Sequence, residues 1–168
     1  MAGSILSILV ADFSDKIHSQ IKTFISKNAK PENDNDFRII DKKTKINAPF
    51  CYEYSSIESN EDYSEFLIEI ENFNLFNIRP KGIVTISAMI NSQEDSLLLA
   101  NFVLNLNIAL NGIVFYNGLL KEDYIKNSDG LIQKINFGFS DNTKIQVHIS
   151  DSIFLKNWIK NKHFKLIK

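Results

Sequence analysis

Acidic side chains are concentrated in one stretch of this 168-residue chain. From Ile46 to Ile78 there is no Lys, Arg or His, and the stretch holds seven acids: Glu53, Glu58, Glu61, Asp62, Glu65, Glu69 and Glu71. Three tyrosines lie among them, namely Tyr52, Tyr54 and Tyr63. Carboxylates beside aromatic rings suit a positively charged protein partner and repel nucleic acid. These residues are therefore the predicted partner-binding site, with an ordinary solvated surface as the alternative.

The chain has no recognisable catalytic or cofactor-binding motif. There is no Gly-x-Ser-x-Gly nucleophile elbow and no glycine-rich phosphate loop. The histidines, which are His18, His148 and His163, have no spacing that would place two of them as ligands on one helix. Cys51 is the only cysteine and lies between two aromatic residues, which is typical of a small buried side chain. We therefore expect no catalytic residue, no metal, no cofactor and no enzymatic activity.

Composition favours one domain over residues 1–168 in a reducing, cytoplasmic compartment. Hydrophobic residues make up 44% of the chain, which is enough for an autonomous core. The net charge of −1 argues against general binding to nucleic acid or to a membrane surface. The uncharged stretch Ser96–Leu120 contains five Asn residues, so a core helix followed by a core strand is expected there instead of a membrane span. Five lysines in Ser152–Lys168 are expected to balance the acidic stretch within the fold.

Alternating and apolar patterns predict more strands than helices. The expected strands are Ser4–Ala11, Phe37–Ile40, Phe50–Ile57, Ser64–Ile70, Ile83–Ile90 and Ile113–Tyr116, followed by a hairpin of Leu131–Phe139 and Lys144–Ile149. Short connections between most of them favour an antiparallel sheet.

Three helices are expected between these strands. The first is capped by Asp12 and stops near Asn28, and the last is capped by Ser152. The second is capped by Ser92 and ends near Asn111, with Gly112 in the left-handed conformation that ends many helices. The predicted class is α+β: a single domain with a largely antiparallel sheet and about three helices packed mainly on one face. A ferredoxin-like split arrangement around the first helix is one option, and the strand order is not predicted.

The strands determine where the acids point, because successive side chains alternate between the two faces of a sheet. In Phe50–Ile57, Cys51, Glu53 and Ser55 share one face, and Tyr52, Tyr54 and Ser56 share the other. In Ser64–Ile70 and the residue after it, Glu65, Glu69 and Glu71 share a face with Leu67. At least three of the acids are thus expected to project from a rigid, water-facing sheet surface.

Two stretches resemble a known family. They are GIVTISAMINSQEDSLLLANFVLNLNIALNGIVFYNG, from Gly82 to Gly118, and HISDSIFLKNWIKNKHFKLIK, from His148 to Lys168. Together they cover about a third of the chain and are similar to small bacterial proteins encoded beside polymorphic toxins, which are taken to be immunity proteins. The resemblance implies a toxin-neutralising function. It does not include the acidic stretch, so it assigns no binding residue.

We therefore expect a cytoplasmic immunity protein that binds one cognate, basic toxin domain and occludes its active site, without binding nucleic acid or membrane. One alternative is a small-molecule enzyme with a pocket built from His148, the Asn residues of the second helix and a carboxylate. The other alternative is an adaptor or chaperone for a secreted effector, which would bind its partner away from the active site. The sequence does not predict the oligomeric state.

Overall fold

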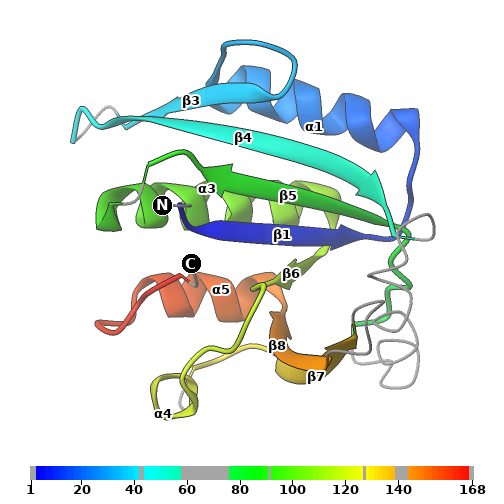
Figure 1. The fold of residues 1–168 in the computed structure, drawn as a ribbon, viewed down its shortest axis with the longest axis vertical. Helices are drawn as coiled ribbons and strands as arrows, with labels where there is room; N and C mark the ends of the chain where they lie inside the picture. Colours follow the sequence, from blue (N-terminus) through cyan, green and yellow to red (C-terminus); the bar gives the residue numbers. More distant parts are fainter. Residues whose placement is uncertain are drawn as a thin grey trace.

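One antiparallel sheet runs through the computed structural model, and the longer helices lie against one of its faces (Figure 1). The structure describes residues 3–41, 44–57, 76–90, 92–126, 128–138 and 144–166. The strands are β1 (Ile5–Val10), β2 (Lys30–Pro31), β3 (Asp36–Ile40), β4 (Asn47–Ser56), β5 (Gly82–Ala88), β6 (Ile113–Phe115), β7 (Ile132–Gly138) and β8 (Lys144–Ser150). The helices are α1 (Asp15–Asn28), α3 (Gln93–Leu110), α4 (Glu122–Ile125) and α5 (Ser152–Ile159). The predicted α+β class is confirmed, while the predicted strand Ser64–Ile70 lies outside the described residues.

The strand order is β2-β3-β4-β5-β1-β6-β8-β7, and every neighbouring pair is antiparallel. Because β5 and β6 both pair with β1, they run parallel to each other, and α3 connects them. A split β-α-β unit therefore forms around α3, whereas the option considered from the sequence placed it around the first helix. The hairpin of β7 and β8 is present as predicted.

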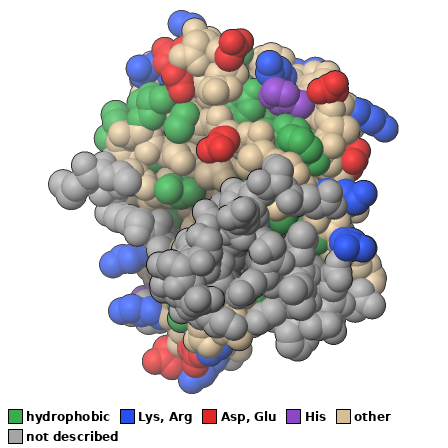
Figure 2. Space-filling view, turned by 45° about the vertical axis from the view of Figure 1, so that its right-hand side comes forward, with side chains coloured by type: hydrophobic (Ala, Val, Ile, Leu, Met, Phe, Trp, Pro, Cys, Tyr) green, Lys and Arg blue, Asp and Glu red, His purple; other side chains and the backbone are tan. Residues whose placement is uncertain are grey.

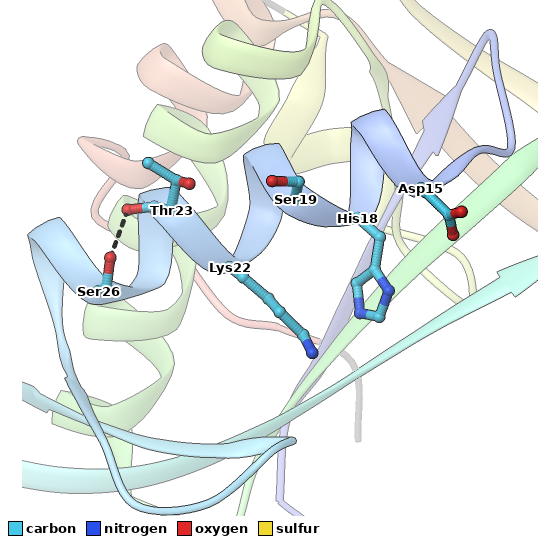
Figure 3. A pocket seen from close by; sticks show the side chains of 6 residues that line it. All are labelled: Asp15, His18, Ser19, Lys22, Thr23 and Ser26. Carbon is cyan, nitrogen blue, oxygen red and sulfur yellow. Dashed lines mark hydrogen bonds between the residues drawn. The ribbon is translucent and has the colours of Figure 1, made fainter.

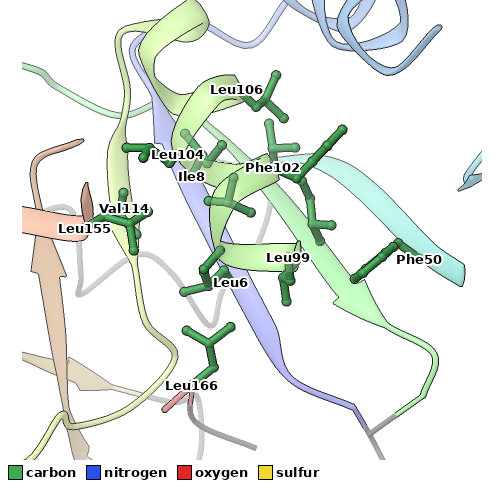
Figure 4. Close-up of a cluster of buried hydrophobic side chains, with 14 of the residues drawn as sticks. Leu6, Ile8, Phe50, Leu99, Phe102, Leu104, Leu106, Val114, Leu155 and Leu166 are labelled. Carbon is green, nitrogen blue, oxygen red and sulfur yellow. The ribbon is translucent and has the colours of Figure 1, made fainter. Parts of the chain in front are cut away.

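The covered face of the sheet, meaning the face that carries α1, α3 and α5, holds the main hydrophobic core. Alternate residues of each strand point into it, and the helices contribute leucines and aromatic rings (Figure 4). From the central strands these are Leu6, Ile8, Val10, Phe50, Val84, Ile86 and Val114, and from the helices they are Ile21, Ile25, Leu99, Phe102, Val103, Leu106, Phe154, Leu155 and Trp158. Burial of this many large side chains is the principal favourable contribution to folding.

Two of the predicted helix caps are one or two residues away from the observed ones. Ser14, not Asp12, is the N-cap of α1, and the Asp12 carboxylate accepts a hydrogen bond of 2.7 Å from the Ser14 hydroxyl. Asp151, not Ser152, caps α5, and its carboxylate accepts from the Phe154 amide at 2.7 Å. In both observed caps, the side-chain oxygen accepts a hydrogen bond from the backbone amide three residues later, which is the usual N-cap geometry.

The predicted Ser92 cap of α3 is confirmed, since its hydroxyl accepts from the Asp95 amide at 2.9 Å. The predicted left-handed residue at the other end is wrong: Asn111 has φ 51°, and Gly112 is not left-handed. Asn tolerates this conformation better than most residues. Gly112 is needed for a different reason, because a Cβ there would lie 2.5 Å from the Ile8 side chain.

The uncharged stretch Ser96–Leu120 forms most of α3 followed by β6, as predicted. Among the helices in the described ranges, none has both the length and the hydropathy needed to cross a bilayer.

Candidate functional site

The sheet face opposite the helices is open over part of β4 and β5. Glu53 is exposed there, in register with Thr85, and Cys51 lies beside Ser87. Within the described part of the chain, Glu53 has no ion-pair partner. Of the ten predicted binding residues, seven lie outside the described residues: Glu58, Glu61, Asp62, Tyr63, Glu65, Glu69 and Glu71. On the side of the molecule shown in Figure 2, the described acidic side chains are separated by cationic, apolar and other groups.

Tyr52 and Tyr54 lie on the covered face and not beside Glu53. Tyr52 is 5% exposed, and its ring packs against Phe37. Tyr54 is half-buried, and its hydroxyl accepts from the Ser14 amide at 3.0 Å. Burial raises the pKa of both phenols. The strand alternation expected from the sequence explains the separation, and it removes these two tyrosines from any surface that includes Glu53.

Cys51 is half-buried, with Sγ 3.9 Å from the carbonyl oxygen of Ser87. Burial, followed by the nearby Asp36 carboxylate, raises the pKa of the thiol. A raised thiol pKa lowers the thiolate fraction, so this cysteine is a poor nucleophile, as expected from its neighbours in the sequence.

A groove beside α1 brings together polar residues that sequence reasoning did not group. Two hollows meet at Lys22. The first, of about 480 Å³, is lined by Asp15, His18, Ser19, Lys22, Thr23 and Ser26 (Figure 3). The second, here called the turn hollow, has a volume of about 150 Å³ and is lined by Lys22, Ile25, Pro31, Asn33, Asp34, Asp36 and Tyr52. One feature of the sequence could have indicated this groove: His18 and Lys22 are four residues apart, a spacing that places two side chains on the same side of a helix. Both project from the same side of α1 in Figure 3.

His18 lines the first hollow and contacts two tyrosines at the edge of the core. It is half-buried, and its ring centroid lies 5.5 Å from that of Tyr54. Its Nε2 lies 3.4 Å from the Tyr52 hydroxyl. That distance is long for a hydrogen bond of a hydroxyl group.

The tight turn between β2 and β3 determines where the two aspartates lie. The Asn33 side-chain oxygen accepts from the amides of Asn35 (2.9 Å) and Asp36 (2.7 Å), and its amide group donates to the Asp36 carboxylate. This local side-chain turn holds Asp34 at the exposed tip.

His148, the residue considered for an enzymatic pocket, is 4% exposed. Its Nδ1 accepts from the Leu120 amide at 2.9 Å, so the imidazole holds the segment after β6 in place. Burial, and then Lys134, lowers the pKa of His148, while Glu122 opposes the shift. Of the asparagines in α3, Asn101 donates to the Leu97 carbonyl within the helix, and Asn107 is buried.

No three His, Cys, Asp or Glu side chains in the described ranges lie close enough together to hold a metal ion.

Together these features define an α+β protein with one antiparallel sheet, a helical layer on one side and a polar groove at the edge of that layer. The chain belongs to a family of unknown function (DUF6368), whose profile matches residues 2–168. No curated protein and no solved structure matches the chain significantly. The family description assigns no activity.

Proposed function

We propose that this chain is an immunity protein that binds a cognate bacterial toxin domain and neutralises it by occluding the toxin's active site. The observation that carries the proposal is the open face of β4 and β5, where Glu53 projects into solvent opposite the helical layer. The resemblance of Gly82–Gly118 and His148–Lys168 to proteins encoded beside toxins supports it.

A sheet surface suits this task because its backbone needs little ordering when a partner binds. The pairing of β4 with β5 includes Glu53, which lies opposite Thr85, so the backbone beneath Glu53 is held by this ladder, while the pairing of β4 with β3 ends at Cys51. An exposed carboxylate on such a surface attracts a basic partner and accelerates its association. A specific complex is expected to bury about 800 Å² on each protein. The other predicted acids would extend the same surface if they share its orientation.

The first test is whether the neighbouring upstream reading frame encodes a large secreted protein with a variable C-terminal domain. Growth of cells that express such a domain is then compared with and without this chain. The wild-type protein should restore growth at about one copy per toxin. Glu53→Lys, and more strongly Glu65→Lys/Glu69→Lys/Glu71→Lys, should slow association and make it less sensitive to salt. Asp129→Lys is the matched control, because Asp129 is an exposed acid outside these strands.

Three outcomes distinguish the alternatives. Binding without inhibition would indicate an adaptor or chaperone. Protection by far less than one copy per toxin would indicate an enzyme. Full protection and unchanged association rates in all the charge-reversal variants would remove the acidic surface from the mechanism.

A further inference from the structure

The outward face of α3 carries no charged side chain after the first turn of the helix. α3 lies between α1 and α5 in the helical layer (Figure 1). Four of its exposed positions recur every three or four residues, at Leu97, Asn101, Asn105 and Ile108. Because of this spacing they lie on one side of the helix, and they are here called the α3 stripe. Its two apolar members are well exposed, Leu97 by 42% and Ile108 by 58%.

The neighbouring helices have charged outward faces. Lys16, Lys22 and Lys27 are exposed on α1, and Lys156 is exposed on α5. A surface helix normally carries charged and polar residues on the side that faces water. Depletion of charge is instead typical of the centre of a protein–protein interface. The α3 stripe is therefore a candidate contact surface.

The order of side chains along the α3 stripe fits a second copy of the same stripe. The stripe reads apolar, amide, amide, apolar in either direction. If two α3 helices pack antiparallel, Leu97 lies opposite Ile108 of the second copy, and Asn101 lies opposite Asn105. A two-fold symmetric interface requires this reciprocity of contacts. Because an Asn side chain has both donors and an acceptor, the opposed amides can form hydrogen bonds with each other.

Charges near the two ends of the α3 stripe are complementary in the same arrangement. Glu94 in the first turn of α3 and Lys27 in the last turn of α1 are exposed, and within the described residues neither has an ion-pair partner. Lys27 lines a hollow of about 290 Å³ between α1 and the C-terminal part of α3, where Leu106 and Leu110 form an apolar wall. Antiparallel packing brings Glu94 of one copy toward this end of the other.

We propose that the chain forms a two-fold symmetric dimer in which two α3 stripes pack antiparallel. A second copy is favoured over an unrelated partner because the stripe is complementary to itself in its apolar, amide and charged groups. The proposal is independent of the proposed function. The α3 stripe lies on the helical side of the sheet and Glu53 lies on the opposite side, so each protomer keeps the surface proposed for the toxin domain.

The dimer is expected to be weak and reversible. The 18 residues of α3 span about 27 Å, and a specific interface usually buries about 800 Å² on each protein. One helix pair covers less than that, so residues of α1 beside the hollow must contribute. We therefore expect a dissociation constant on the order of micromolar.

The oligomeric state of the full chain tests the proposal. Sedimentation equilibrium between about 1 and 500 μM should show a reversible change from the chain mass of 19.3 kDa to twice that mass. Leu97→Glu and Ile108→Lys should each weaken the dimer by about tenfold or more, because each substitution occurs twice in the interface. Ile40→Lys is the matched control, since Ile40 is 50% exposed on β3, away from α3, and it should leave the dimer unchanged.

The double variant Leu97→Glu/Ile108→Lys tests the antiparallel arrangement itself. It places a carboxylate opposite an ammonium group twice across the symmetry axis, so it should dimerise more tightly than either single variant. Unchanged far-UV circular dichroism and urea midpoints show that the variants are folded, as expected for substitutions at exposed positions.

A chain that is monomeric at every concentration would overturn the proposal, and α3 amides that shift when the toxin domain is added to such a monomer would assign the stripe to that partner instead. A dimer that is unaffected by Leu97→Glu and Ile108→Lys would also overturn it. So would a double variant that dimerises no more tightly than the single variants, because the two copies would then not be antiparallel. Protection against the toxin is measured separately, so the failure of either proposal is recognised on its own.

Discussion

The covered face of the sheet is packed from β3 to β6, whereas the opposite face is packed at one end and open at the other. On the covered face, helices bury alternate residues of each strand in turn. On the opposite face a smaller cluster is buried, made of Leu9, Ile57, Ile83, Ile113, Phe115, Ile135, Val147 and Ile149, with Phe76 and Ile78 against it. The rest of that face, around Glu53, is open and polar. The difference indicates that the covered face supplies most of the stability, whereas the region around Glu53 is exposed to solvent.

The largest expected effect is on the free energy of unfolding, and it is found by comparing a substitution on the covered face with one on the opposite face. Phe37 is fully buried between aromatic rings on the covered face, with its ring 5.0 Å from Phe102. Phe37→Ala should lower the free energy of unfolding by about 3–5 kcal/mol, because it removes a large buried ring and leaves a cavity. Glu53→Ala on the open region should change it by less than about 0.5 kcal/mol. Urea denaturation of both variants measures the difference, and similar losses would mean that the open region also carries stability.

A smaller effect is expected where α3 turns back toward β1. A Cβ at Gly112 would lie 2.5 Å from the Ile8 side chain and 2.7 Å from the Leu9 carbonyl oxygen. Gly112→Ala should therefore cost about 1–3 kcal/mol of unfolding free energy. Asn111→Gly is the control, since glycine accepts the left-handed conformation there, and it should change stability by about 1 kcal/mol or less. If thermal and urea unfolding show Gly112→Ala to be neutral, the packing of α3 on β1 is looser than the structure indicates.

The smallest expected effect is a pH dependence that comes from His148. Its pKa in the folded protein lies below the ordinary value of 6.5, so the unfolded chain binds the proton more tightly. The stability contributed by the neutral imidazole is fully present above about pH 6.5 and is lost as the pH falls through the lowered pKa. Protonation also places a donor at the nitrogen that accepts from the Leu120 amide. Urea midpoints between about pH 7.5 and 5.5 should fall for the wild type and less for His148→Gln.

His163→Gln is the control for the slope of the urea midpoint against pH, because His163 is exposed. A slope that disappears in His163→Gln and persists in His148→Gln would show that the buried imidazole is not responsible.

Local patterns in the sequence predicted most elements correctly. Period-two alternation located β4 and the β7–β8 hairpin, an apolar run located β5, and the Ser92 cap located the start of α3. These features depend on residues that are close along the chain, which is why they could be predicted. The cap errors at Asp12 and Ser152 arose because neighbouring residues can supply equivalent side-chain oxygens.

The candidate site was harder to predict from the sequence than the strands and helices. The tyrosines were grouped with Glu53 because they are adjacent in sequence, although the alternation already placed them on the other face. The turn hollow was missed because its walls come from α1, the turn before β3, and β4, and nothing in the sequence shows that these segments meet.

The amino-acid pattern was sufficient for the α+β class, the antiparallel character of the sheet and the sets of residues in a strand that share a face, because propensity and periodicity are local. The strand order, the split unit around α3 and the meeting of Lys22, Asp34 and Tyr52 in one hollow depended on the folded chain. These features arise from how helices pack on the sheet, and that packing is decided by contacts between residues far apart in sequence.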